Sequence, residues 1–140
     1  METARIEFGN KIEEIGRLVS FLEELSQKLD LSVETAFNIH LALEEAITNV
    51  IMYAYPKDEE HVIELAVHNT DNELIFEIID EGVEFDPTLH PDADTTLALD
   101  ERPIGGLGIF LIRRIMQKVE YRREDGRNIL TLVKELDKVK

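Results

Sequence analysis

Two polar side chains, Glu45 and Asn49, lie four residues apart in the otherwise apolar segment LALEEAITNVIMYAY. At 100° per residue they share one face of a helix, whereas Glu44 points about 100° away. Asn is a poor residue for a helix interior because its side chain competes for backbone hydrogen bonds. The pair can be a solvated polar face. It can also be a reaction centre, in which Asn49 offers an oxygen to a hard cation such as Mg²⁺ and Glu45 accepts a proton from a nucleophile.

A second candidate is the acidic sequence Asp80-Glu81-Gly82, which ends an apolar strand pattern. Asp next to Gly is common in turns, so turn chemistry alone can explain it. Alternatively, the Asp80 carboxylate accepts a hydrogen bond from an exocyclic amine. Gly82 would then leave room for a flat ring to approach the backbone.

A third candidate is the glycine-rich sequence Gly105-Gly106-Leu107-Gly108, directly before a helical pattern. Glycines there let the backbone turn sharply and present N–H groups, which together with a helix N-terminus can bind an anion. A flexible hinge is the alternative. The segment is neither a Walker A loop nor GxGxxG, since no GK[ST] follows and a loop precedes it. The four histidines are scattered and lack the spacing of metal ligands.

The elements that position these residues are predicted from hydrophobic spacing. Helices are expected at residues 11–29, from the candidate N-cap Ser32 to about Tyr53, and at 109–117. Strands are expected at 3–9, 61–69, 72–80, 119–124 and 128–136, with a long loop at 81–104. We therefore expect one domain, residues 1–140, of the α+β class. It would be a two-layer α/β sandwich in which about three helices cover one face of a mixed sheet.

Composition limits the classes of function. The chain has 140 residues, 44% of them hydrophobic, and no cysteine, so it is long enough for a buried core but offers no disulfide or thiolate site. It shows no signal-peptide pattern and no apolar run of the roughly 18 residues that a membrane span needs. We expect a cytoplasmic protein that does not contact a membrane.

The charge is strongly acidic but uneven. The net charge of −15 disfavours direct contact with nucleic acid. Residues 1–100 carry 5 Lys and Arg against 24 Asp and Glu, whereas residues 101–140 carry 10 against 6. The cationic section around the glycine-rich sequence suits a phosphate or an acidic partner, and a solvated surface of mixed charge is the alternative.

Taken in order, the three candidates resemble the conserved boxes of the GHKL (Bergerat-fold) ATPase and kinase superfamily. Residues 45–49 look like the N box, residues 80–82 like the D-x-G box and residues 105–108 like the second glycine box. The resemblance implies that residues 83–104 form a long ATP lid, and Phe85-Asp86-Pro87 matches the way many lids begin. The chain departs from the family pattern at Tyr53, where members often carry His, and at Asn128, where they often carry Thr.

The resemblance implies a role for each matching residue. ATP and Mg²⁺ would be the ligands, with Asn49 coordinating the metal and Glu45 acting as general base. Asp80 would bind the adenine amino group, and Asn128 would leave the nucleotide contacts adjusted rather than abolished. The remaining cofactor-binding residues would shape the pocket or approach the phosphates: Gly82, Arg102, Gly105, Gly106 and Gly108.

The chain is most similar to the stand-alone anti-sigma factor and serine-protein kinase branch of that superfamily. This implies an ATP-dependent serine/threonine kinase that phosphorylates a small anti-sigma-antagonist protein of the STAS type in a partner-switching circuit. Members can also bind a sigma factor, and they tend to form homodimers. The alternative is a nucleotide-gated protein-binding module with little or no kinase activity, and a simple ATPase ranks third. The intact Glu45 favours the kinase, because a pure binding module needs no base.

Overall fold

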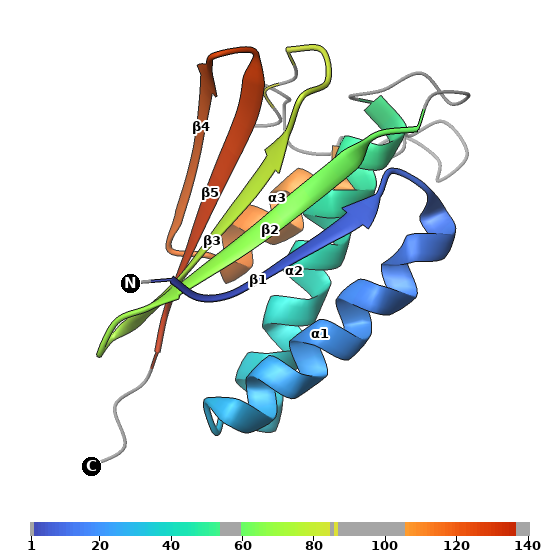
Figure 1. The fold of residues 1–140 in the computed structure, drawn as a ribbon. Coiled ribbons are helices and arrows are strands. Elements are labelled where there is room, and N and C mark those ends of the chain that lie inside the picture. The colour runs from blue at the N-terminus through green and yellow to red at the C-terminus, as the bar shows by residue number, and fades with distance from the viewer. Residues whose placement is uncertain (1, 54–59, 85, 87–105, 137–140) are drawn as a thin grey trace.

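The described residues form five strands and three α-helices (Figure 1). The computed structural model describes the chain except residues 1, 54–59, 85, 87–105 and 137–140. In chain order the elements are β1 (Glu2–Gly9), the 3-10 turn η1 (Ile12–Glu14), α1 (Ile15–Lys28), α2 (Val33–Tyr53), β2 (Val62–Asn69), β3 (Glu73–Asp80), α3 (Gly106–Ile115), β4 (Lys118–Glu124) and β5 (Arg127–Glu135). The predicted helices and strands are confirmed, with ends shifted by a few residues. The expected loop and lid lie largely outside the described residues.

The sheet has the strand order β1-β2-β3-β5-β4, and all four neighbouring pairs among the described strands are antiparallel. The α+β class is confirmed, but the expectation of a mixed sheet is wrong. β3 and β4 do run in the same direction. They are not neighbours, however, because β5 lies between them and is antiparallel to both. The register places Asp80, the last residue of β3, opposite Asn128 on β5.

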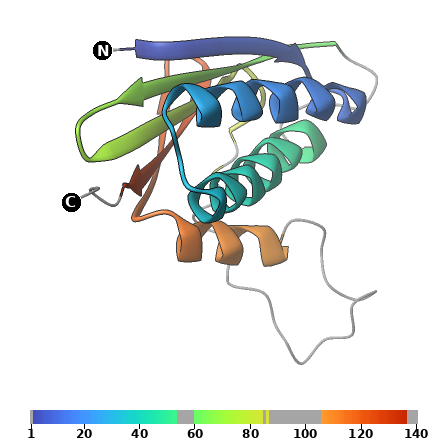
Figure 2. The same cartoon turned by 90° about the horizontal axis from the view of Figure 1, so that it is seen from below.

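All three helices lie on one face of the sheet, with α2 between α1 and α3 (Figure 2). Their apolar sides and the inward residues of the strands form the core, in which the largest fully buried side chains include Phe8, Leu18, Leu43, Ile47, Leu65, Phe76, Ile78 and Ile112. Burying each such side chain contributes about 1.5–3 kcal/mol. The expected two-layer arrangement is thereby confirmed. In the described part of the chain, no helix is both long and apolar enough to cross a membrane.

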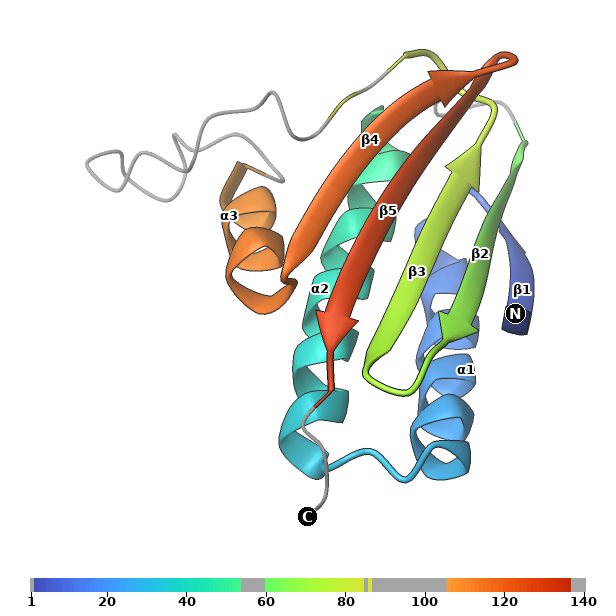
Figure 3. The ribbon, with the colours of Figure 1, turned by 90° about the vertical axis from the view of Figure 1, so that its left-hand side faces the viewer.

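No described helix covers the opposite face of the sheet (Figure 3). Ion pairs between strands lie on this face. Glu77 on β3 accepts a hydrogen bond at 2.9 Å from His68 Nε2 on β2, and its other oxygen lies 3.8 Å from Arg122 on β4. Arg122 also donates to Glu124 at 3.0 Å. Arg122 therefore belongs to the open face, on the side of the sheet away from the helices.

Two local signals in the sequence determine where the elements near the site begin and turn. The Ser32 hydroxyl accepts a hydrogen bond at 3.1 Å from the Thr35 backbone N–H, which confirms Ser32 as the N-cap of α2. Asp125 and Gly126 both have positive φ angles, 52° and 77°. Two consecutive positive φ angles are typical of a type I′ turn, the connection that best matches the twist of a two-residue hairpin. β4 and β5 therefore form a tight hairpin.

Candidate functional site

Asn49 is buried in α2 without a protein partner for its amide oxygen. Its side chain is 4% exposed, and Oδ1 is the buried side-chain atom among the described residues for which no hydrogen bond is found. Leaving such an atom unpaired costs about 1–3 kcal/mol. A buried, unpaired oxygen is the type of ligand that Mg²⁺ accepts beside phosphate oxygens. The residue present therefore fits the predicted metal ligand.

Glu45 lies one turn before Asn49 on α2 and is half-buried. Burial raises the pKa of the Glu45 carboxyl above its ordinary value, and the negative charge of Glu44 raises it further. A raised pKa moves a carboxylate toward the range in which it works as a general base near neutral pH. Glu44 itself is exposed, as its position about 100° around the helix predicts.

Asp80 is buried at the end of β3, with 3% of its surface exposed. Its Oδ1 accepts two hydrogen bonds, from the Gly82 backbone N–H at 2.8 Å and from Asn128 Nδ2 at 2.9 Å. Burial raises the pKa of the Asp80 carboxyl, while these two bonds and the positive charge of Arg123 act in the opposite direction. Asp80 is therefore a carboxylate held in place from one side in a largely dry site.

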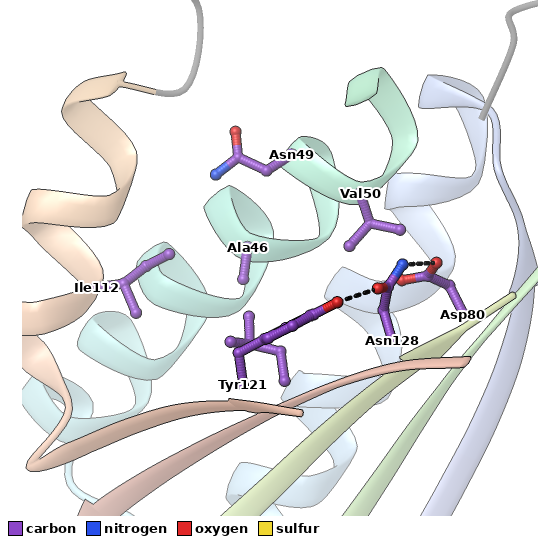
Figure 4. A pocket seen from close by; sticks show the side chains of 8 residues that line it. Ala46, Asn49, Val50, Asp80, Ile112, Tyr121 and Asn128 are labelled. Atoms are coloured by element: carbon purple, nitrogen blue, oxygen red, sulfur yellow. Dashed lines mark hydrogen bonds between the residues drawn. The ribbon is translucent and has the colours of Figure 1, made fainter. Parts of the chain in front are cut away.

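Asn128 donates a hydrogen bond to Asp80, a contact that the sequence did not predict. Its Nδ2 also donates to the Val83 backbone oxygen at 2.8 Å, and its Oδ1 accepts from the Tyr121 hydroxyl at 2.5 Å. Figure 4 shows the Tyr121 ring between Ala46 on α2 and Asn128 on β5, with its hydroxyl directed at Asn128.

Arg123 is a site residue that the sequence interpretation did not select. Its Nη1 donates to the Gly82 backbone oxygen at 2.8 Å and to Asn128 Oδ1 at 3.1 Å. The signal that could have found it is the two-residue period of β4. Val119 and Tyr121 are partly buried on the side of the helices, and Arg123 continues that alternation.

Asn49, Asp80 and Asn128 line one pocket between α2, α3 and the end of the sheet (Figure 4). The pocket brings together two predicted site residues that are far apart in sequence, Asn49 and Asp80, and is lined by Ala46, Asn49, Val50, Asp80, Ile112, Tyr121, Asn128 and Leu130. The free space in this pocket measures about 10 Å³, room for about one water molecule. A nucleobase could enter this pocket only if the side chains that line it moved apart. Glu45 is not part of this lining.

The remaining predicted residues are distributed around the pocket. The Gly82 backbone N–H is bonded to Asp80, and Gly106 and Gly108 lie in the first turn of α3. A helix N-terminus with glycines in its first turn leaves backbone N–H groups available to an anion. Arg102 and Gly105 lie outside the described residues.

Comparison with known proteins agrees with this arrangement. The family described as "Histidine kinase-like ATPase domain" matches residues 8–134. Serine/threonine-protein kinase BtrW of Bordetella bronchiseptica is 31% identical over 112 residues, which cover 80% of this chain and 79% of that protein. Serine-protein kinase RsbW of Halalkalibacterium halodurans is 28% identical over 129 residues, covering 89% of this chain and 78% of that protein.

A solved structure shares the fold. It contains the RsbU and RsbW domains of a Mycobacterium tuberculosis protein and superposes with a TM-score of 0.67 at 15% sequence identity. The match covers 96% of this chain but 33% of that larger chain, and it bears on the fold alone. The predicted superfamily is thus confirmed by the family match, and the shared architecture agrees with it. The chain belongs to the family of histidine kinase-like ATPase domains.

Proposed function

We propose that the chain is an ATP-dependent serine/threonine protein kinase that also acts as an anti-sigma factor. The relatives named as serine kinases support the activity, and they match most of the chain. The observation that carries the proposal is the Glu45 carboxylate, half-buried with a raised pKa and one helical turn from Asn49. A module that only bound nucleotide would have no use for a base at this position.

The proposed reaction moves the terminal phosphoryl group of ATP to a serine hydroxyl. The serine oxygen forms a bond to the γ-phosphorus while the bond from that phosphorus to the oxygen of the leaving ADP breaks. Glu45 accepts the proton that the hydroxyl loses. Asp80 would hold the adenine amino group. The backbone at Gly82, Gly105, Gly106 and Gly108 would shape the nucleotide site, with Arg102 near the terminal phosphates.

Asn49 is the residue that we propose as the ligand of Mg²⁺. Bound together with ATP, this ion would neutralise charge on the phosphates. The buried, unpaired Asn49 Oδ1 supports this role, and carboxylates need not complete the site because Mg²⁺ usually takes its other ligands from phosphates and water. No group of three or more acidic or histidine side chains that could hold a metal occurs among the described residues.

The proposed partner is a small anti-sigma-antagonist protein of the STAS type, whose serine is the acceptor. A sigma factor is the second proposed partner. In this proposal, residues 1–140 act as one cytoplasmic domain that forms a homodimer. The first strand, β1, lies at an edge of the sheet and could pair with a second copy.

Phosphoryl transfer with labelled ATP tests the function. Wild type, Glu45→Gln and the neighbouring control Glu44→Gln are incubated with the antagonist proteins encoded in the same genome, and labelled serine is quantified. We expect transfer by wild type and by Glu44→Gln. Loss of a general base typically slows transfer about 10²–10⁴-fold, so Glu45→Gln should do so while ADP affinity stays near that of wild type.

Two outcomes would change the conclusion. Equal transfer by wild type and Glu45→Gln would show that Glu45 is not the base. A wild type that binds ATP and retains a partner, yet phosphorylates none of the candidates, would favour the nucleotide-gated binding module.

A further inference from the structure

The outward side of α3 carries an aromatic ring and two cations. Ile109 and Ile112 turn inward and are fully buried in the core. Phe110, Arg113 and Arg114 are spaced three and four residues apart, so they lie together on the side of the helix that faces away from the core. Phe110 is 37% exposed, and both arginines are exposed. An apolar surface and a positive charge are therefore presented side by side.

The ring and one of the cations are already in contact. The Arg114 guanidinium lies 5.3 Å from the centroid of the Phe110 ring, which is within the range of a cation–π interaction. Residues 106–115 contain no acidic side chain, and none of the described carboxylates forms an ion pair with Arg114. The charge of Arg114 is thus available to carboxylates of another molecule.

Stabilisation of the helix is a simpler explanation for the arginines. Arg113 and Arg114 lie in the last turn of α3, where positive charges interact favourably with the helix dipole. That interaction explains the two charges but not the exposed ring of Phe110 next to them. Aromatic side chains and arginine are both enriched where proteins bind one another. The combination therefore favours a contact surface.

This surface lies close to the proposed phosphate end of the nucleotide site. α3 is the outermost helix of the layer, beyond α2 (Figure 2), and its first turn contains Gly106 and Gly108. At 1.5 Å per residue, Phe110 is about 6 Å and Arg114 about 12 Å from Gly106 along the helix axis. A protein whose serine reached the phosphates at that end would extend over the outward side of α3.

The distribution of charge determines which kind of protein surface would bind there. The chain has a net charge of −15, and residues 1–100 carry 24 Asp and Glu against 5 Lys and Arg. An acidic partner would be repelled by most of this surface, whereas α3 offers it two positive charges and no negative one. Charge complementarity of this kind orients a partner during its approach.

We propose that Phe110, Arg113 and Arg114 form a docking surface for an acidic patch on the protein substrate. Carboxylates of the substrate face the two arginines, and an apolar side chain covers the Phe110 ring. This proposal rests on the proposed function, because it assumes that the chain phosphorylates another protein. The surface acts on the binding of that protein and leaves nucleotide binding and the transfer step unchanged.

Transfer kinetics of the full chain test the proposal, with the antagonist protein that wild type phosphorylates as the varied substrate. Loss of a contact made equally in the ground state and the transition state raises KM and leaves kcat unchanged. We expect Phe110→Ala to raise KM roughly tenfold and Arg114→Gln up to about fivefold. Reversing both charges, with Arg113→Glu and Arg114→Glu together, should raise KM further than either. ADP affinity should stay at the wild-type value.

Two matched controls come from other surfaces of the protein. Phe37→Ala removes an aromatic ring that is 61% exposed near the start of α2. Arg122→Gln removes a cation from the open face of the sheet, where it contacts Glu77 and Glu124. Both variants should show the KM of wild type.

Salt and a charge-conserving variant separate docking from stabilisation of the helix. The KM ratio of Arg114→Gln to wild type should shrink as NaCl is raised from about 0.1 M to 1 M, because the Debye length falls from about 10 Å to about 3 Å. Arg114→Lys keeps the charge and should keep a KM near that of wild type. If the arginines only stabilise α3, Arg114→Gln should lower the unfolding temperature and leave KM unchanged, which would overturn the proposal.

The outcomes distinguish the docking surface from the proposed function. If wild type phosphorylates an antagonist, and folded Phe110→Ala and the charge-reversed variant have its KM, the docking surface is overturned and the proposed function stands. If wild type binds an antagonist without phosphorylating it, the kinase assignment fails, and affinity for that protein replaces KM in the same comparison. If wild type neither phosphorylates nor binds one, both are overturned. Thermal unfolding establishes that each variant is folded, and Arg114→Gln keeps the test decisive if Phe110→Ala does not fold.

Discussion

Replacing Asp80 with Asn should separate nucleotide binding from stability. The new amide can keep its oxygen toward the Gly82 N–H and Asn128 Nδ2, so both existing hydrogen bonds to that position survive. The second carboxylate oxygen becomes an N–H₂ group, which cannot accept a hydrogen bond from an adenine amine. Binding should suffer although the local structure does not.

The magnitude follows from the bond that is lost. A hydrogen bond to a charged group contributes about 1.5–3 kcal/mol, so Asp80→Asn should weaken ADP binding roughly 10- to 100-fold. Stability should move differently. Burial raises the pKa of Asp80, so the folded state favours its protonated form, and this contribution is full at acidic pH and is lost as the pH rises through the raised pKa. The uncharged amide has no such loss, so unliganded Asp80→Asn should be at least as stable as wild type at pH 7.

Calorimetry with ADP and thermal unfolding as a function of pH measure the two effects on the same samples. Glu73→Gln, at the other end of β3, removes the same charge from the same strand and should change neither. An ADP affinity equal to that of wild type would refute the assignment of Asp80 to the base. Marked destabilisation of Asp80→Asn at pH 7 would refute the account of its buried charge.

Three further predictions concern α2. Because the pKa of Glu45 is raised by burial and by Glu44, the acid limb of kcat/KM should lie above the ordinary pKa of Glu, and Glu44→Gln should move it to lower pH in a pH–rate profile. Asn49→Leu removes an unpaired buried amide, so unliganded protein should gain about 1 kcal/mol in urea unfolding while Mg²⁺-dependent ATP binding is lost. Ser32→Ala removes the N-cap and should lower the free energy of unfolding by about 1 kcal/mol, with nucleotide affinity unchanged.

The fold could be predicted from the sequence wherever the signals were local. The period of the apolar residues located the helices and strands, Ser32 located the start of α2, and the glycines located α3. The order of the strands in the sheet has no such local signal. Nothing in the spacing of residues 119–136 indicates that β5, rather than β4, pairs with β3, and the mixed sheet was wrong for that reason.

The site residues likewise divide into those with a local sequence signal and those that only the fold brings together. Asn49 was selected because Asn is unusual in a helix interior, and Asp80 because a carboxylate followed by a glycine ends an apolar strand pattern. The structure places both at one pocket. The part played by Asn128 could not be predicted, because its partner Asp80 is 48 residues away and meets it only through sheet register. Arg123 is one of ten cationic residues in the last 40, and only its parity on β4 distinguishes it from Arg122.

The tight β4–β5 hairpin has a consequence for folding kinetics. The contacts of Asn128 with Tyr121 and Arg123 span seven and five residues, so their closure entropy is small, and a hairpin can form in about 1–10 μs. The pairing of β3 with β5 is a long-range event and should follow more slowly. The side chains of β4 and β5 around Asp80 would thus be assembled before Asp80 arrives, whereas the Gly82 N–H that also donates to Asp80 lies outside residues 121–128 and follows β3 in the chain.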